Sequence, residues 1–376
     1  MKIGIGQQSK LIQLVEQPSL EAMFHDEYPF FTGSSEQMKL HFAQFAHDLV
    51  GSTYWPGRGA KVIEIGCNDG SLISRFKNFG ALTVGIDPAA NVLANAKESG
   101  VEVIEGFFAP DTAIGIRSAF GAFDLVVAAN VICHIPDLCS LGAGIDMILT
   151  PQGVFVFEEP YWGDVFRLAS YDQFYDEHVF MFSCESVAAW GTTFGFELVD
   201  VQHQVTHGGS MRYFLARSGQ RSTNSRVAQY LDWERRAGIN EIANLRNFAT
   251  RVSRSRDELT NFIGEARSDG KDIWAYAATS KSTTIFNYCG FTQREITAIC
   301  DSTSQKQGRY APGSNIPVVS IDNFRKECPE FTFLSAWNHA REIWNKEDQY
   351  ATRGGKWITH VPRVRIVEPA ESLIID

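Results

Sequence analysis

The chain has 376 residues, of which 44% are hydrophobic and 21% charged, and its formal net charge is −10. Because this length exceeds what one hydrophobic core usually supports, two or three domains are expected. The acidic balance and the scattered lysines and arginines argue against a nucleic-acid-binding protein, and no apolar run reaches membrane-spanning length. The seven cysteines form no CxxC pair, which indicates buried thiols in a reducing cytoplasm and no cysteine-ligated metal site. The N-terminus lacks the apolar stretch of a signal peptide, so a cytoplasmic protein is expected.

Residues 1–50 are expected to form an N-terminal helical or lid segment. Residues 1–20 show only weak amphipathic character, and an aromatic-rich loop containing Tyr28 follows. Ser34 or Ser35 could cap the next helix. By itself, such a loop is more often packing than chemistry. The helical pattern that follows aligns Met38, Phe42, Phe45 and Leu49.

The strongest single pattern is at residues 61–72, where an apolar strand, a glycine turn and the start of a helix follow one another. Gly66 and Gly70 would let the backbone approach a ligand without a Cβ in the way. Asn68 stands where a dinucleotide fingerprint has its second glycine, which favours a cofactor without a pyrophosphate. The turn resembles motif I of class I S-adenosylmethionine methyltransferases, whose strand carries an acid near its end, here Glu64. That carboxyl would accept hydrogen bonds around the methionine end of the cofactor.

Three further strand–helix units follow at the spacing of that fold. Strand 81–86 leads to Asp87, about 20 residues after the glycine turn, where an acid can bind both ribose hydroxyls. Segment 101–108 is expected to give the third strand and the adenine-side loop, and segment 123–137 the fourth strand with its polar exit. Four such units in register predict a methyltransferase fold. The expected cofactor-binding residues are Glu64, Gly66, Asn68, Gly70, Asp87, Pro88, Phe107 and Asn130.

A polar loop at residues 171–178 combines phenols, carboxylates and an imidazole. It follows a strand at 154–157 that ends in the paired acids Glu158 and Glu159. The carboxyl end of a strand is where open α/β sheets place their chemistry. The loop is therefore expected to supply the base and the proton-handling groups of a transferase. Two more strands, at 197–202 and 211–216, would form a hairpin beside the substrate.

The second half of the chain predicts another α/β domain. A charged helical region from 224 to 267, with a bend at Gly238, leads to strands at 273–276, 296–301, 316–319 and 331–334. A glycine-flanked basic loop with Lys306 and Arg309 suits a pyrophosphate, although ordinary solvated charges would explain it too. The turn at 277–282 lacks G-x-G-x-x-G, which argues against NAD. The predicted fold is α/β, with a class I Rossmann-like methyltransferase domain followed by a second Rossmann-like domain. The expected boundaries are 1–50, 51–220 for the cofactor-binding domain, 221–268 for the helical connector and 269–376.

Several motifs together resemble bacterial sugar C-methyltransferases over roughly residues 28–367. They are Tyr175-x-Glu177-His178, His207-Gly208-Gly209-Ser210-Met211-Arg212, Asn287-Tyr288-Cys289-Gly290 and Lys306-Gln307-Gly308. These enzymes methylate C3 of nucleotide-linked 4-keto deoxysugars, so the resemblance implies S-adenosylmethionine, a role in natural-product biosynthesis and an active site between the two domains. It implies His178 as the base, with Glu177, Tyr175, His134 and Tyr28 as further catalytic residues. It implies substrate contacts at Ser34, His207, Ser210, Arg212, Lys281, Lys306 and Arg309.

The chain departs from that family in two places. Family members usually begin with a cysteine-ligated zinc domain, but here no cysteine precedes Cys67. The turn at 277–282 has lost glycines that are expected where a phosphate approaches. A different carrier for the sugar, or none, is therefore an open alternative.

Carbon methylation requires a carbanion, and a C–H is acidic enough only beside a carbonyl. His178 would remove that proton, and Glu177 would fix its tautomer. Tyr175, His134 or Tyr28 would donate to the enolate oxygen, so no metal is expected. The partner would be a small molecule, and the protein a monomer or homodimer that binds neither nucleic acid nor membrane. The alternatives are a C- or O-methyltransferase acting on a non-sugar keto substrate, and a non-catalytic or NAD-binding protein.

Overall fold

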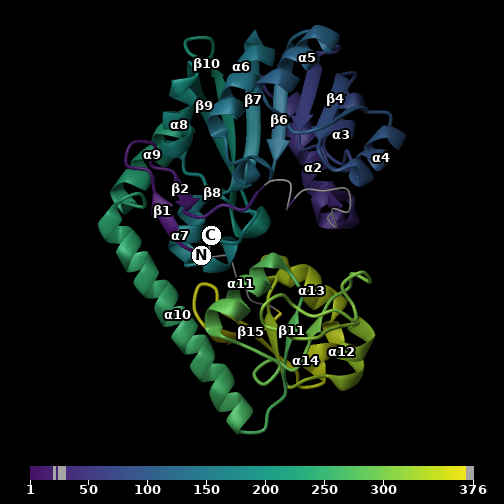
Figure 1. Ribbon diagram of the computed structural model, residues 1–376, viewed down its shortest axis with the longest axis vertical. Coiled ribbons are helices and arrows are strands. Elements are labelled where there is room, and N and C mark those ends of the chain that lie inside the picture. The colour runs from purple at the N-terminus through teal and green to yellow at the C-terminus, as the bar shows by residue number, and fades with distance from the viewer. Residues whose placement is uncertain (20–22, 24–30, 370–376) are drawn as a thin grey trace. The chain divides into compact units, whose positions relative to one another are not determined.

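The computed structural model describes residues 1–19, 23 and 31–369, and it folds into two compact units (Figure 1). Unit 1 takes its described residues from Met1–Tyr161, Asp176–Gln204 and Met211–Ala237. Unit 2 consists of Trp162–Tyr175, Val205–Ser210 and the described chain from Gly238 onward. Tyr28 lies outside the described residues.

A seven-stranded sheet forms the centre of unit 1, in the order β5-β4-β3-β6-β7-β10-β9. β3 is parallel to both β4 and β6, which lie on opposite sides of it, so the strand order reverses between β3 and β6. Open parallel sheets bind ligands at the carboxyl ends of the strands beside such a reversal. The strands are β3 (Lys61–Ile65), β4 (Leu82–Asp87), β5 (Glu102–Glu105), β6 (Phe123–Ala129), β7 (Leu149–Pro160), β9 (Phe196–Gln204) and β10 (Ser210–Arg217).

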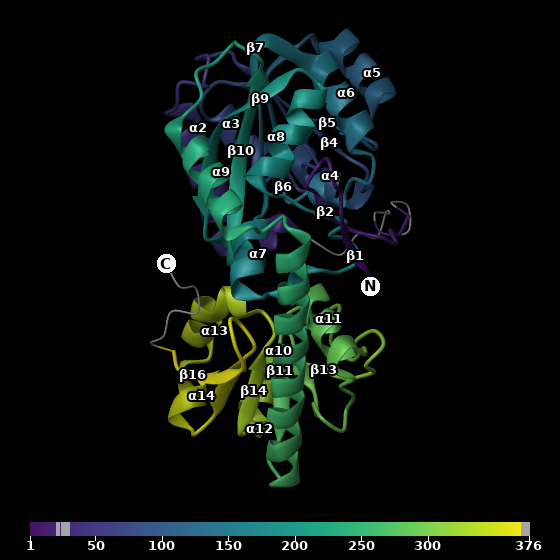
Figure 2. The same ribbon diagram turned by 90° about the vertical axis from the view of Figure 1, so that its left-hand side faces the viewer.

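Both faces of this sheet are covered, because neighbouring residues of one strand enter different hydrophobic cores. Ile63 and Ile65 of β3 join one core and Val62 the other. A strand buried on both faces is apolar throughout, which is why these strands could be recognised in the sequence. Helices lie in front of and behind the sheet (Figures 1 and 2). They are α2 (Glu36–Val50), α3 (Ile73–Lys77), α4 (Ala90–Glu98), α5 (Pro110–Phe120), α6 (Leu138–Ile148), α8 (Cys184–Thr193) and α9 (Ser225–Ala237).

A second, three-stranded sheet in unit 1 was not predicted. β1 (Ile3–Ile5) pairs with β2 (Ile12–Leu14), and β2 pairs with β8 (Phe180–Met181), all antiparallel. The Leu14 N–H also donates to the Val179 carbonyl at 2.8 Å. Strands this short carry no periodic signal, so the prediction of weak amphipathic character alone for residues 1–20 was incomplete. The N-terminal hairpin is thereby fixed to the chain directly after His178.

Unit 2 contains a six-stranded sheet in the order β13-β12-β11-β14-β15-β16. Its strand pairs are parallel except for β15 with β16. The long helix α10 (Ile242–Ser268) is separated from α9 by Gly238, whose φ is +60°, so the predicted bend is a break between two helices (Figure 2). The strands are β11 (Ile273–Tyr276), β12 (Ile299–Cys300), β13 (Val318–Val319), β14 (Phe331–Leu334), β15 (Lys356–Thr359) and β16 (Arg365–Val367). The other helices are α7 (Trp162–Leu168), α11 (Ser280–Cys289), α12 (Ile321–Glu327), α13 (Ala340–Lys346) and α14 (Asp348–Thr352).

Two segments from the middle of the chain join unit 2 through buried polar contacts. Asp172 is fully buried and accepts from Nε1 of Trp337 at 2.8 Å, and Nε2 of His360 lies 3.3 Å from the same carboxylate. Nζ of Lys281 donates to the carbonyl of His207 at 3.3 Å. Assignment to a unit therefore does not follow chain order alone, and the boundaries expected from the sequence stay a prediction. The short 3₁₀ turns are η1 (Thr32–Ser34), η2 (Ile132–His134), η3 (Tyr171–Gln173), η4 (Thr206–Gly208) and η5 (Trp337–His339).

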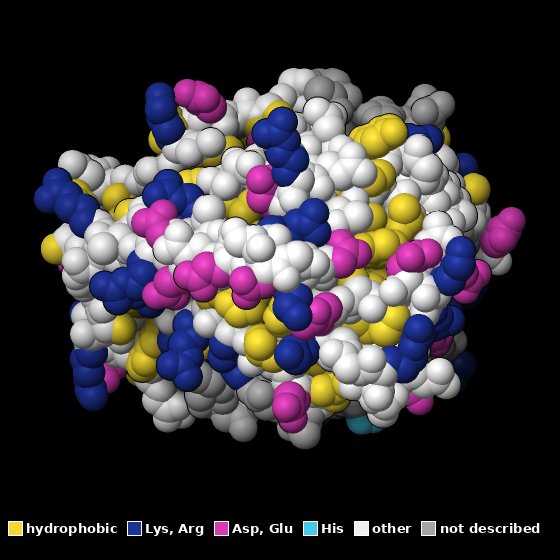
Figure 3. Space-filling model, turned by 90° about the horizontal axis from the view of Figure 1, so that it is seen from below, with side chains coloured by type: hydrophobic (Ala, Val, Ile, Leu, Met, Phe, Trp, Pro, Cys, Tyr) yellow, Lys and Arg dark blue, Asp and Glu magenta, His cyan; other side chains and the backbone are white. Residues whose placement is uncertain are grey.

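The surface carries charges of both signs. On the face shown in Figure 3, the coloured side chains intersperse Lys and Arg with Asp and Glu, and apolar groups lie between them. This distribution agrees with the scatter of charges along the sequence. Among the described residues, no helix combines the length and the apolar character needed to cross a bilayer.

Candidate active site

The glycine turn after β3 has tight protein packing around both glycines. Gly66 has a φ of +68°, and a Cβ there would overlap the side chain of Val131, which follows β6. Gly70 has a φ of +78°, and a Cβ there would lie 3.0 Å from that of Ala96 in α4. Both positions favour glycine for their backbone conformation as well. Packing against the protein itself thus accounts for both glycines, and their contact with a cofactor stays a prediction.

The acids of β3 and β4 hold this turn in place. Asp87 accepts from the Asn68 N–H with one oxygen and from the Ala89 N–H with the other, each at 2.9 Å. Glu64 accepts from the Ile73 N–H at 2.9 Å, at the start of α3. Burial raises the pKa of Asp87, and it raises the pKa of Glu64 well above the ordinary value. Both predicted cofactor ligands thus already stabilise backbone groups, and their contacts with a cofactor stay a prediction.

The segment before α2 is fastened to the same turn. The Thr32 N–H donates to Oδ1 of Asn68 at 3.1 Å, and the Gly33 N–H donates to Oδ2 of Asp69 at 2.7 Å. Ser35 caps α2 by accepting from the Met38 N–H, so of the two predicted caps Ser35 is the one observed. Ser34 lies in η1, and its side chain is outside the described part of the structure. Asn68 therefore binds the N-terminal segment instead of opening the turn to a phosphate.

The neighbouring strand ends carry the other residues predicted to bind the cofactor. Phe107, just after β5, keeps 38% of its surface exposed, and Gly106 has no atom within 4 Å of the place where a Cβ would lie. Pro88 follows Asp87 and is half-buried. Asn130 adopts a left-handed φ of 55°, and its N–H donates to the Glu158 carbonyl at 2.8 Å. An exposed aromatic ring, an acid and open space at adjoining strand ends fit the adenosine of S-adenosylmethionine.

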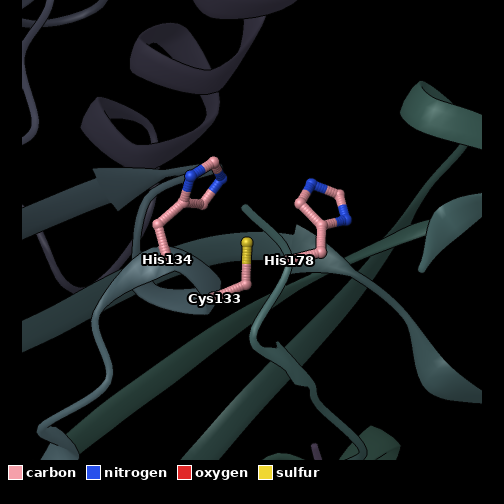
Figure 4. Close-up of side chains that lie close together, drawn as sticks. All are labelled: Cys133, His134 and His178. Atoms are coloured by element: carbon pink, nitrogen blue, oxygen red, sulfur yellow. The ribbon is translucent and has the colours of Figure 1, made fainter. Parts of the chain in front are cut away.

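Two imidazoles and a thiol meet where β6 and the polar loop end. The ring centroids of His134, in η2, and His178, just before β8, are 5.4 Å apart with a 67° angle between the ring planes. Sγ of Cys133 points into the space between the rings (Figure 4). The ligand atoms of the three residues lie within 4.8 Å of one another, and all three residues are buried. Burial lowers the pKa of His134 to about 4 and raises the pKa of the Cys133 thiol well above its ordinary value, so this imidazole is neutral and the thiol protonated near pH 7.

Glu159, at the end of β7, supports this cluster and was not assigned to the site from the sequence. It is fully buried, and its Oε1 accepts from the N–H groups of Val131 at 2.9 Å and Ile132 at 2.6 Å. Burial raises the pKa of its carboxyl to about 7. The paired acids at a strand end were the available signal, but the sequence could not show which turn the second acid binds. Glu159 thus fixes the backbone that leads into Cys133 and His134.

Glu158, the other acid of the pair, belongs to a buried ion cluster with Arg212. Nη2 and Nε of Arg212 lie 2.9 and 3.0 Å from Oε2 of Glu158, and His41 lies 2.5 Å from Oε1. Burial alone would raise the pKa of Glu158, but Arg212 and His41 hold it at about 2. Arg212 is 1% exposed, and its guanidinium lies 3.8 Å over the ring of Phe45. The predicted substrate ligand Arg212 therefore has a structural role between α2, β7 and β10, and direct contact with a substrate stays a prediction.

Two further predicted catalytic residues, Glu177 and Tyr175, are only partly buried. Glu177, in unit 1, is half-buried, and burial together with the neighbouring Asp176 raises the pKa of its carboxyl. Tyr175, in unit 2, is half-buried as well. Their roles beside His178 stay predictions.

The predicted substrate ligands of unit 2 differ in how accessible they are. Burial lowers the pKa of Lys281 to about 8, and its amine is engaged with the His207 carbonyl. His207 itself has a left-handed φ of 55°. Ser210 is fully buried and donates to the Thr206 carbonyl at 3.0 Å. Lys306 and Arg309 lie in a more open loop, where Nζ of Lys306 donates to the Ala278 carbonyl at 2.7 Å and Arg309 is exposed. Nζ of Lys306 also lies 3.5 Å from Oδ2 of Asp301, so of this set only Arg309 is both exposed and basic without that neighbour.

Comparison with known proteins gives matches to both halves of the chain. Residues 36–201 match a family described as a methyltransferase domain, and residues 205–362 match the C-methyltransferase C-terminal domain. The chain is 32% identical over 316 residues to C-methyltransferase NovU of Streptomyces niveus, covering 84% of this chain and 75% of that protein. It is also 34% identical over 104 residues to a ubiquinone biosynthesis O-methyltransferase of Methylobacterium sp. (strain 4-46), covering 27% of this chain and 41% of that protein.

Solved methyltransferase structures resemble this chain more distantly. They include a SAM-dependent methyltransferase from Anabaena variabilis, at 15% identity over 54% of this chain and 98% of the other, with a TM-score of 0.39. Magnesium protoporphyrin IX methyltransferase from Synechocystis with bound SAM matches at 15% identity over 48% and 79% of the two chains, with a TM-score of 0.35. Both TM-scores are below 0.5, so these structures contribute nothing further. The match to NovU over most of both chains, together with the C-methyltransferase C-terminal domain, shows that the chain belongs to the S-adenosylmethionine-dependent C-methyltransferases.

Proposed function

We propose that this C-methyltransferase methylates a carbon atom next to a ketone, and that its substrate is a nucleotide-linked 4-keto deoxysugar methylated at C3. The observation that carries the proposal is the pair of buried imidazoles of His134 and His178 at the strand ends of the methyltransferase sheet. Two such groups can serve proton removal and stabilisation of the charge that follows. The similarity to a C-methyltransferase supports carbon as the methylated atom.

His178 acts as the base in this proposal. Its imidazole nitrogen takes the proton from the carbon beside the carbonyl, and the electrons of that C–H bond move into an enolate. Glu177 fixes the tautomer of His178 and stabilises the imidazolium that forms. The position of His178 supports this role, because β8 begins two residues later and pairs with β2, which holds the backbone there.

The enolate oxygen needs hydrogen-bond donors. His134, whose ring centroid lies 5.4 Å from that of His178, is one candidate, and Tyr175 and Tyr28 are further candidates. Glu159 orients His134 indirectly, since it holds the N–H groups of the turn that precedes it. Bound S-adenosylmethionine would supply the electrophilic methyl group. Glu64, Gly66, Asn68, Gly70, Asp87, Pro88, Phe107 and Asn130 are the residues proposed to hold this cofactor.

The nucleotide part of the substrate would bind to unit 2. Lys306 and Arg309 would contact its phosphates, because their loop is open and basic. Lys281 and His207 are joined by a hydrogen bond and would contribute together. Ser34, Ser210 and Arg212 complete the proposed set of substrate residues, and a role in deoxysugar biosynthesis follows from this substrate.

Proton exchange tests the base directly. Wild-type protein, incubated in D₂O with a nucleoside-diphosphate 4-keto-6-deoxyhexose and S-adenosylhomocysteine, should exchange the C3 proton, and with S-adenosylmethionine it should give a C-methylated product. His178→Asn should lose both the exchange and the methylation. A methyl ether as the product, or unimpaired exchange in His178→Asn, would overturn the proposal.

A further inference from the structure

We propose that Cys133, His134 and His178 form a binding site for a thiophilic divalent cation such as Zn²⁺, and that the bound cation inhibits methyl transfer. We call these three residues the Cys–His–His cluster. Metal binding follows from the geometry of the cluster. The inhibition rests on the proposed function, because it requires that the two imidazoles serve the reaction.

The cluster has nearly the dimensions of a metal site. Its three ligand atoms lie within 4.8 Å of one another, whereas ligand atoms around a tetrahedral zinc are about 3.3–3.8 Å apart, given bonds of about 2.1 Å to nitrogen and 2.3 Å to sulfur. Rotations of the side chains that move each ligand atom by about an ångström would close this difference. The three residues belong to unit 1 and converge on one point, with Sγ of Cys133 between the rings (Figure 4).

The donor set selects the kind of cation. One thiolate and two imidazoles suit Zn²⁺ and Co²⁺, whereas Mg²⁺ and Ca²⁺ prefer oxygen ligands. On binding, the metal–sulfur bond forms, the S–H bond of Cys133 breaks, and the proton leaves to solvent. Three protein ligands leave a fourth position, which a water molecule would fill.

The backbone on both sides of the cluster is held firmly, which favours a preformed site. Oε1 of Glu159 accepts from the two N–H groups just before Cys133. On the other side, the Val179 carbonyl next to His178 accepts from the Leu14 N–H. Outer groups that fix the backbone of metal ligands raise the affinity of the site.

A cation in the cluster would stop proton removal. The imidazole nitrogen that takes a proton from carbon uses the same lone pair that would bind the metal. A bound cation therefore competes with the reaction without touching the nucleotide or the glycine turn. Chelation would restore activity, so the cluster would act as a metal-dependent off switch.

Cobalt provides a readout that does not depend on activity. Full-length protein freed of metal by a chelator is titrated with Co²⁺ and followed by its absorption spectrum. We expect about one equivalent to bind, with d–d bands of a tetrahedral site and a sulfur-to-cobalt charge-transfer band, and Zn²⁺ to displace it. Cys133→Ala should lose the charge-transfer band and bind at least about tenfold more weakly. The control Cys139→Ser removes an exposed thiol nearby in the chain and should behave as wild type.

Methyl transfer is then measured at increasing Zn²⁺. We expect inhibition of wild type that a chelator reverses, and a half-inhibiting concentration at least about tenfold higher in Cys133→Ala. Thermal unfolding of the metal-free variants checks folding, and Cys133→Ser replaces Cys133→Ala if the latter does not fold. Absence of the charge-transfer band in wild type, or equal binding by Cys133→Ala, would overturn the metal site. Cobalt binding without inhibition of an active enzyme would overturn the off switch, and cobalt binding by a protein that methylates no keto sugar would overturn only the proposed function.

Discussion

Replacing Arg212 with methionine should destabilise unit 1, because the guanidinium neutralises a carboxylate that has no access to water. Glu158 is 0% exposed and has its pKa held at about 2, against 4.5 for an ordinary glutamate. This difference corresponds to about 3 kcal/mol in favour of the ionised form, to which both Arg212 and His41 contribute. Removing one partner of a buried ion pair costs about 3–5 kcal/mol in other proteins. We therefore expect Arg212→Met to lower the free energy of unfolding by about 3 kcal/mol at pH 7.

The loss should depend on pH in a defined direction. Because the folded-state pKa of Glu158 is depressed, the stabilisation is complete above the ordinary pKa of 4.5 and is lost as the pH falls through about 2. In Arg212→Met the buried carboxyl would instead take up a proton more readily, which relieves its desolvation. The difference between wild type and Arg212→Met should therefore be largest at neutral pH and become smaller in acid.

Urea unfolding followed by tryptophan fluorescence at pH 7 and pH 4 measures both effects. Arg236→Met is the matched control, because Arg236 forms an ion pair with Asp232 on the surface with 79% of its side chain exposed, and it should cost less than about 1 kcal/mol. The double variant Arg212→Met/Glu158→Gln removes the buried charge and should recover part of the loss.

Two results would refute this reasoning. One is a loss in Arg212→Met no larger than that in Arg236→Met. The other is an unchanged free energy of unfolding combined with a raised KM for the keto sugar, which would show that Arg212 serves the substrate, as the sequence first suggested.

Three further predictions concern the site. His178→Asn should lower kcat at least about 10²-fold, while the affinity for S-adenosylmethionine, measured by calorimetry, stays unchanged. A parallel loss of that affinity would mean that His178 holds the cofactor. Gly66→Ala should lower the melting temperature, because its φ of +68° and the side chain of Val131 both oppose a Cβ. Gly219→Ala is the control for backbone strain alone, because Gly219 also has a positive φ but no atom within 4 Å of an added Cβ. An equal fall in melting temperature in the two variants would exclude a contribution from the clash with Val131. Arg309→Ala should raise the KM for a nucleotide-linked substrate and leave kcat unchanged, whereas Arg363→Ala should leave the KM unchanged. If the two variants have the same KM, Arg309 does not bind the substrate phosphates.

The sequence by itself determined the sheets that hold the site. Most strands of the two large sheets could be recognised, because burial on two faces makes a strand apolar throughout. The glycine turn at 66–70 and Asp87 mark two strand ends. The last two strands of the second sheet, β15 and β16, were not predicted. The break at Gly238 was visible for the same kind of local reason, since the chain there adopts a positive φ. Features of this kind depend on residues close together in the chain.

Tertiary structure alone decided which distant side chains meet. β1 pairs with β2, and β2 pairs with β8 from a distant part of the chain, whereas three-residue strands have no periodicity of their own. The sequence alone cannot tell whether Arg212 contacts a ligand or Glu158. Only the packing of α2 and β7 around Arg212 shows its contact with Glu158. Cys133 and His178 likewise come from separate segments, and no spacing rule joins them. Local conformation is determined by residues close together in the chain, whereas long-range contacts depend on how the whole sheet folds.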